Sequence, residues 1–157
     1  SCLPNSNLKY FIYDLPKKVI LGNEILQNHP SLKKKIKFIS NIENVNRLDI
    51  LYFGSSIQYF SDYIDRIKNL LLKKPKYILF TDNYFTKEES FVTSQTSVIN
   101  LIIPYNVFNY KEFILLFKNN NYHLIYKSVN FNPTHYINLS SIYNNTFNLL
   151  FKKNNDK

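Results

Sequence analysis

The chain has 157 residues, 45% of them hydrophobic, which is enough for one domain whose core needs neither disulfides nor a metal. These proportions exclude collagen-like, coiled-coil and low-complexity proteins. Cys2 is the only cysteine and no His/Cys cluster has metal-ligand spacing, so we expect no disulfide framework and no metal site. The longest apolar runs fall far short of the roughly 20 residues that cross a bilayer, and no signal-peptide pattern is present. We therefore expect a cytoplasmic protein with no membrane partner.

The net charge of +9 raises the question of nucleic-acid binding. The composition offers another explanation, because Lys, Asn, Ile, Tyr and Phe dominate and alanine is absent, which is the residue bias of an AT-rich genome. Only Arg47 and Arg66 represent arginine, the preferred residue for bidentate contacts to phosphate and guanine. The composition thus argues against sequence-specific nucleic-acid recognition, and we expect most lysines to form a solvated surface.

The first half of the chain alternates strands with helices. Residues 8–13 form an apolar and aromatic run that predicts a strand, and Pro16 suits the first turn of a following helix over residues 17–28. That helix should end at Pro30, because the residue before a proline disfavours helical backbone. Two further short apolar runs, each closed by polar turn residues, predict strands over residues 36–39 and 48–53.

From Phe60 the apolar positions follow one helical face, and the helix should stop before Pro75. A strand over residues 77–80 comes next. The polar stretch 84–97 predicts a long functional loop, which leads into the apolar run 98–103.

Near the C-terminus, Asn109 and Glu112 have the spacing of a helix capping box. Two strand-like runs follow, residues 122–129 and 147–151, with no room between them for a crossover helix, so they should pair antiparallel. We predict a single α/β domain over residues 1–151, with a mostly parallel sheet and a C-terminal antiparallel strand, and a polar tail over residues 152–157.

In doubly wound sheets, ligands bind outside the carboxyl ends of the strands, so the polar residues there are the candidate site. An acidic residue that closes an early strand can accept both ribose hydroxyls of a nucleotide-like cofactor, and Asp14 has that position. Asp14 could equally be a helix cap. The other strand-end residues are Ser40, Asn41, Gly54, Ser55, Ser56, Thr81, Asp82 and Asn83.

The run 48–62, with its Asp-led strand, Gly-Ser-Ser turn and Ile-Gln-Tyr sequence, resembles a family of S-adenosylmethionine-dependent methyltransferases from bacterial surface-polysaccharide gene clusters. Other segments resemble the family's motifs in the same order, so the resemblance covers roughly residues 8–151. They are residues 77–83, 92–95, 103–105 with Phe108, and 121–124.

The resemblance implies a Rossmann-like methyltransferase sheet with S-adenosylmethionine as the cofactor. It implies that Asp14 binds the cofactor ribose, that Ser40 and Asn41 lie near the adenine, and that Gly54, Ser55 and Ser56 close over the sulfonium. Gln58 and Tyr59 would present the acceptor, a sugar or a related small polar molecule or glycan. Asp82 would be the general base for a hydroxyl acceptor, and the less favoured candidates are His123 and His135.

Two features depart from the family. Its Asp-Arg pair is Asp82-Asn83 here, and the glycine-rich cofactor turn after the first strand is missing, since Gly22 and Gly54 are the only glycines. By the resemblance, residues 8–14 are the second strand. We therefore expect the first strand, its loop and its helix to lie upstream of Ser1. A sheet without that central strand would expose edges that favour self-association.

Two alternatives remain at this point. The chain could be a non-catalytic module that binds nucleic acid or another polyanion through the lysine cluster of residues 33–37. It could also be a degenerate remnant that keeps the fold without the activity.

Overall fold

A computed structural model describes residues 8–43, 45–97, 101–130 and 142–155 of the chain. Contacts between Cα atoms divide the chain into two compact units, which we call unit 1 (Ser1–Asn46) and unit 2 (Arg47–Lys157). Each unit is described by itself. The single-domain boundary 1–151 stays a prediction.

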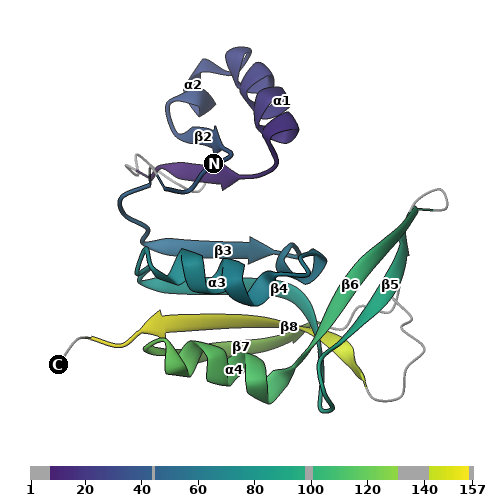
Figure 1. The fold of residues 1–157 in the computed structure, drawn as a ribbon. Helices are drawn as coiled ribbons and strands as arrows, with labels where there is room; N and C mark the ends of the chain where they lie inside the picture. Colours follow the sequence, from purple (N-terminus) through teal and green to yellow (C-terminus); the bar gives the residue numbers. More distant parts are fainter. Residues whose placement is uncertain (1–7, 44, 98–100, 131–141, 156–157) are drawn as a thin grey trace. The chain divides into compact units, whose positions relative to one another are not determined.

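Unit 1 contains two parallel strands and two helices (Figure 1). Strands β1 (Tyr10–Tyr13) and β2 (Ile36–Ile39) pair in parallel, so that Phe11 is opposite Lys37. Helix α1 (Pro16–Gln27) connects them and buries Gly22 and Leu26. Gly22 is required there, because a Cβ atom at this position would lie 2.5 Å from the ring of Phe38.

The predicted end of α1 before Pro30 is confirmed, but a short helix that the sequence did not indicate follows at once. Helix α2 (Pro30–Lys33) has Pro30 in its first turn, where a proline costs no backbone hydrogen bond. The same proline therefore ends one helix and starts the next.

Unit 2 begins with a second parallel strand pair. Strand β3 (Ile50–Gly54) pairs in register with the first half of β4 (Tyr77–Thr86), and between them lie the 3-10 helix η1 (Ile57–Tyr59) and helix α3 (Tyr63–Leu71). Helix α3 buries Ile67, Leu70 and Leu71. The predicted face is correct at Ile67 and Leu71 and wrong at Ile64, which is 41% exposed.

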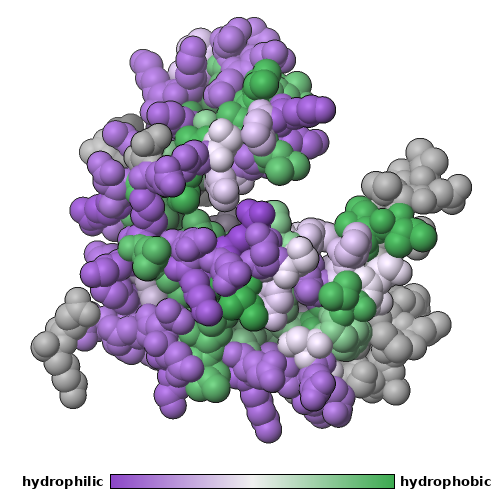
Figure 2. Space-filling model, in the orientation of Figure 1, coloured by the Kyte–Doolittle hydropathy of each residue, from purple (hydrophilic) through white to green (hydrophobic). Residues whose placement is uncertain are grey.

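The prediction of a long loop over residues 84–97 is wrong. Strand β4 continues to Thr86, and β5 (Phe91–Ser97) pairs antiparallel with β6 (Leu101–Asn109). Figure 1 shows these two strands as a hairpin arm, and apolar side chains gather over it in Figure 2, among them Val92 and Ile102. Serine and threonine within β5 made the segment look like a loop, although β-branched residues fit a half-exposed strand.

The C-terminal elements occur as predicted in type and pairing, but the last strand is longer than residues 147–151 and includes two residues of the predicted polar tail. Helix α4 (Tyr110–Asn119) starts at an N-cap, Asn109, whose side chain accepts the backbone N–H of Glu112 at 2.9 Å. Strands β7 (Tyr122–Asn130) and β8 (Ile142–Lys153) pair antiparallel, and β8 also pairs antiparallel with β4.

The fold is therefore α/β, with a mostly parallel arrangement of the early strands and antiparallel strands at the C-terminal end. The large sheet has the order β5-β6-β4-β8-β7, with β3 also paired to β4. Within the described residues, β1 pairs only with β2 and β3 pairs only with β4, so one edge of each strand has no strand partner.

Phenylalanine rings form the core of unit 2 around Phe80, which is fully buried on β4. Its ring stacks on that of Phe53 from β3, with centroids 4.7 Å apart, and meets Phe117 of α4 edge-on. Such aromatic pairs contribute roughly 0.5–1.5 kcal/mol each beyond the burial of apolar area. The core thus fixes β3 and β4 side by side, and with them the residues at their carboxyl ends.

No helix among the described residues is long and apolar enough to cross a membrane.

Candidate functional site

The turn after β3 is tightly connected to a bulge inside β4, at residues 81–83, where the sequence predicted that β4 would end. Gly54 is opposite Thr81 in the register of β3 and β4, and the backbone N–H of Ser55 donates to the Thr81 carbonyl at 3.1 Å. The Ser55 hydroxyl donates to the backbone carbonyl of Asp82 at 3.3 Å. A Cβ atom at Gly54 would lie 2.7 Å from the hydroxyl at the end of the Tyr52 side chain, which would have to move to admit it. The structure thus brings Gly54, Ser55 and Asp82 together.

Asp82 occupies a β-bulge in β4. Between Phe80 and Asn83 the strand advances three residues while β8 advances two, and Asp82 has a left-handed backbone with φ 57°. The backbone N–H of Asp82 donates to the side chain of Asn148 at 3.0 Å. Bulges re-aim a side chain, and strained backbone clusters at functional sites.

The Asp82 carboxylate is held from one side. Its Oδ1 accepts from Nδ2 of Asn130 at 2.9 Å and from the hydroxyl of Thr146 at 3.4 Å. Both donors come from β7 and β8, which are the antiparallel strands that follow α4. Because Asp82 is exposed, the carboxylate is open to a ligand while these strands fix its orientation.

Gln58 and Tyr59 are placed by the 3-10 helix that follows Ser56. The Asn106 side chain of β6 donates to the backbone carbonyls of Gln58 at 2.8 Å and Phe60 at 3.0 Å, and so ties the helix to the hairpin. Gln58 is 1% exposed, whereas Tyr59 is 40% exposed. Ser56 is the N-cap of this helix and makes no side-chain capping bond.

Tyr59 belongs to a cluster of three tyrosines with Tyr105 and Tyr84. The ring of Tyr105 meets Tyr59 edge-on at 5.5 Å and Tyr84 at 5.9 Å. Burial raises the pKa of Tyr105 above its usual range, and the nearby Tyr59 phenol adds to the shift. Burial likewise raises the pKa of Tyr84, with a further contribution from the Asp82 carboxylate. Both phenols therefore keep their protons at neutral pH and remain hydrogen-bond donors.

Buried polar atoms near this cluster have no hydrogen-bond partner among the described residues. They are Oε1 of Gln58, Oδ1 of Asn83 and the hydroxyl of Tyr84. Each unsatisfied group costs about 1–3 kcal/mol, so native proteins carry few of them. Sequence reasoning missed Tyr84, Tyr105 and Asn106, because it placed Tyr84 in a loop and only the strand pairing brings β6 beside η1.

The remaining predicted residues belong to unit 1, at the carboxyl ends of its strands. Asp14 follows β1, and its Oδ1 accepts the backbone N–H of Leu15 at 2.7 Å. The N-cap of α1 is Leu15, which makes no side-chain capping bond, so the interpretation of Asp14 as the cap is wrong. Asn41, after β2, forms a local turn with Glu43, and Ser40 is exposed beside it.

The histidines lie outside this arrangement. His123 is bonded through Nδ1 to the side chain of Asn154, at the start of β7. Asp82 contacts Asn130, which lies at the other end of β7 from His123. At about 3.3 Å per strand residue, His123 and Asn130 are about 23 Å apart. His135 lies outside the described residues. No group of three His, Cys, Asp or Glu side chains that could hold a metal occurs in the described ranges.

The fold is similar to that of several solved structures. An S-adenosylmethionine-dependent methyltransferase of Methanosarcina mazei is 14% identical with a TM-score of 0.59, over 91% of this chain and 80% of that protein. A methyltransferase of the same description from Clostridium acetobutylicum is 11% identical with a TM-score of 0.54, over 94% and 76%. The [4+2]-cyclase SpnF is 9% identical with a TM-score of 0.64, over 95% and 68%.

No protein-family model matches the sequence, and no curated protein matches it either. The structural similarities therefore establish the α/β fold of S-adenosylmethionine-dependent methyltransferases. Because a cyclase has the same fold, the activity has to be argued from the residues at the strand ends.

Proposed function

We propose that the chain is the C-terminal part of an S-adenosylmethionine-dependent methyltransferase that methylates a hydroxyl of a sugar or a related small polar acceptor. One observation carries this proposal. The chain has the methyltransferase fold, and polar residues close its strands at the carboxyl ends, where such folds bind ligands.

By the sequence resemblance, the residues expected to hold the cofactor follow three strands, β1, β2 and β3. Asp14 offers an exposed carboxylate whose remaining lone pairs suit the ribose hydroxyls. Ser40 and Asn41 would contact the adenine. The turn of Gly54, Ser55 and Ser56 would approach the sulfonium end, and the left-handed backbone of Ser55 is the kind of strain that clusters at functional sites.

Two observations support a longer protein that supplies the rest of this site. The described residues contain no glycine-rich turn after a strand, and β1 and β3 each have one edge without a strand partner. A preceding segment with a strand and a glycine-rich turn would pair with such an edge and bring backbone N–H groups to the cofactor.

Methyl transfer is an in-line displacement, so the protein mainly supplies proximity and orientation. The cofactor supplies an activated methyl group when it is bound. For a hydroxyl acceptor, the Asp82 carboxylate would take the proton as the new carbon–oxygen bond forms, and Asn130 and Thr146 hold that carboxylate in place. Tyr59, Tyr84 and Gln58 would contact the acceptor.

The proposal is tested with the complete natural gene product, radiolabelled S-adenosylmethionine and a panel of nucleotide-linked sugars. We expect label to reach one of the sugars, and Asp82→Asn to slow the transfer by about 100-fold or more. Asp65→Asn, an exposed carboxylate on α3, is the matched control and should leave the rate unchanged. Equal rates for the two variants would remove Asp82 from the proposed chemistry.

A further inference from the structure

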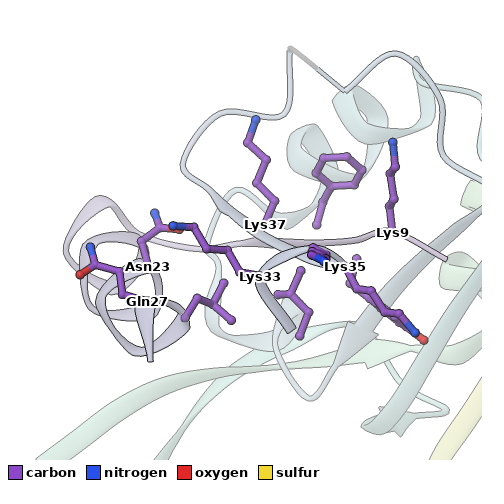
Figure 3. A pocket seen from close by; sticks show the side chains of 11 residues that line it. Lys9, Asn23, Gln27, Lys33, Lys35 and Lys37 are labelled. Atoms are coloured by element: carbon purple, nitrogen blue, oxygen red, sulfur yellow. The ribbon is translucent and has the colours of Figure 1, made fainter. Parts of the chain in front are cut away.

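Unit 1 carries a hollow of about 580 Å³ whose lining is strongly basic. It is formed by the starts of β1 and β2 together with α1 and α2 (Figure 3). Five of the seven lysines of unit 1 line it, whereas none of its three carboxylates does. The five are Lys9, Lys33, Lys34, Lys35 and Lys37.

These lysines have no anionic partner in the part of the chain that the structure describes. The ion pairs there join Arg47 to Asp49 and Arg66 to Asp62, both outside the hollow. Five ammonium groups around one hollow repel each other, and an anionic ligand would remove that repulsion. Figure 2 shows hydrophilic side chains over much of the visible face of unit 1.

The strand register adds an aromatic ring to the basic lining. Phe11 is opposite Lys37 across the β1–β2 pair and two residues beyond Lys9, so all three are on the same face of the two strands. Figure 3 shows Lys9 and Lys37 pointing to the same side. Phe11 is 38% exposed and lines the hollow. A ring between two ammonium groups can stack on a base while its neighbours contact phosphates.

Amide side chains form the other wall. Asn23 and Gln27 are one turn apart on α1, and Figure 3 shows Lys33 extending toward them. Side-chain amides can both donate to and accept from base edges and phosphate oxygens. Because Gly22 of α1 packs on Phe38, α1 covers the strand face opposite to Phe11 and Lys37, so the amide groups and the ring line different sides of the hollow.

The hollow is separate from the residues assigned to the cofactor. Its strand residues, Tyr10 and Ile36, begin β1 and β2, whereas Asp14 and Ser40 follow the opposite ends of those strands. Four strand residues place the two ends about 10–13 Å apart.

We propose that this basic hollow binds single-stranded nucleic acid, with lysines on the phosphates and Phe11 stacked on a base. The chemistry favours this ligand over an inorganic polyphosphate, because a polyphosphate has no ring that could stack on Phe11. The lack of arginine in the hollow means that binding does not depend on base sequence. This inference does not rest on the proposed methyltransferase activity.

The test is fluorescence anisotropy of the full chain with a labelled 12-nucleotide oligothymidylate. Binding should weaken steeply with salt, with a slope of log K against log salt of about −3. The double variant Lys35→Glu/Lys37→Glu should bind at least tenfold more weakly. The control Lys73→Glu/Lys111→Glu changes the net charge equally at positions outside the hollow and should have a much smaller effect.

Variants at Phe11 separate nucleic acid from other polyanions. Phe11→Ala should weaken oligothymidylate binding about tenfold without changing competition by inorganic polyphosphate. Phe11→Tyr keeps a ring and should bind as the natural chain does, which controls for loss of folding. The proposal is overturned if both lysine pairs have equal effects, or if polyphosphate and oligothymidylate bind alike and Phe11→Ala affects neither. Binding to phosphatidylserine vesicles without binding to the oligonucleotide would also overturn it.

Discussion

The Ser55 hydroxyl donates to the backbone carbonyl of Asp82 at 3.3 Å, and both residues have left-handed backbone, with φ 45° and φ 57°. This bond joins the turn after β3 to the bulge in β4. Left-handed backbone is unfavourable for residues with a Cβ atom, by roughly 1–2 kcal/mol each. The end of β3 and the neighbouring bulge in β4 thus carry strained backbone side by side.

Substitutions at Asp82 should separate the backbone strain from the side-chain bonds. Asp82→Ala removes the acceptor for Asn130 and Thr146 and keeps a Cβ atom at positive φ, so we expect a loss of about 1–3 kcal/mol in the free energy of unfolding. Asp82→Gly loses the same bonds but adopts this φ without strain, and should be more stable than the alanine variant by about 1 kcal/mol. Urea denaturation measures both. Equal stability of the two variants would show that the backbone stores no strain.

Asn109 should be one of the most sensitive surface positions. Its Oδ1 accepts the N–H of Glu112 at 2.9 Å, and its Nδ2 donates to the carbonyl of Glu88 at 2.6 Å. Asn109→Ala loses the N-cap of α4 and the link to the β4–β5 connection, for an expected cost of about 1–2 kcal/mol. Asn109→Asp keeps the cap and should recover about half of that. Thermal unfolding followed by circular dichroism would show an unchanged midpoint if the cap were unimportant.

Gly22 tests the packing of unit 1. Alanine is favoured over glycine in a helix by about 1 kcal/mol, but a Cβ atom at Gly22 would meet the Phe38 ring at 2.5 Å. We therefore expect Gly22→Ala to destabilise by about 1–3 kcal/mol in spite of its helix propensity. Phe38→Leu makes room, so the double variant should lose less than the sum of the two single changes. Glu24→Ala, at an exposed position of α1, should be neutral, and additive losses would contradict the contact.

Buried phenols should make the protein sensitive to alkali. Burial raises the pKa of Tyr122 to about 12, and its hydroxyl donates to the Pro75 carbonyl at 2.8 Å. Between about pH 10 and 12 the folded state keeps this proton while the unfolded state has lost it. The free energy of unfolding should then fall with rising pH, by roughly 1.4 kcal/mol per pH unit for one phenol, and be constant below pH 10.

Tyr122→Phe should reduce this slope, while Tyr126→Phe, at a position 55% exposed, should not. Urea denaturation at pH 8, 10 and 11 measures the effect. If the free energy of unfolding falls with pH equally in the natural chain, Tyr122→Phe and Tyr126→Phe, the Tyr122 phenol titrates normally.

The elements that the sequence predicted correctly depend on local signals. The capping spacing of Asn109 and Glu112 marks the start of α4 within four residues, and the short connection between residues 129 and 147 allowed only antiparallel pairing. The hairpin of β5 and β6 was missed, because its stability comes from pairing between strands and from packing of Phe91 against Tyr84 and Tyr105. Such contacts leave only a weak pattern in the sequence.

The candidate site was predictable to a similar degree. Asp14 and Gly54 were accessible as residues that close strands, whereas Asp82, predicted to follow a strand, lies at a bulge inside β4. Their assignment to the cofactor or to catalysis stays a prediction. The bulge at Asp82 was not predictable, because it arises from the pairing of β4 with β8, whose sequences lie more than 60 residues apart. The contact of Asn106 with η1 depends in the same way on tertiary packing.

Equilibrium binding of S-adenosylhomocysteine to the complete natural gene product, measured by isothermal titration calorimetry, tests the central claim most directly. The methyltransferase proposal predicts saturable binding that Asp14→Asn weakens at least tenfold and that Glu24→Gln, an exposed carboxylate of the same unit, leaves unchanged. Absence of saturable binding would contradict the proposal. Equal binding by the natural protein, Asp14→Asn and Glu24→Gln would support the cofactor assignment but show that Asp14 does not contact the cofactor.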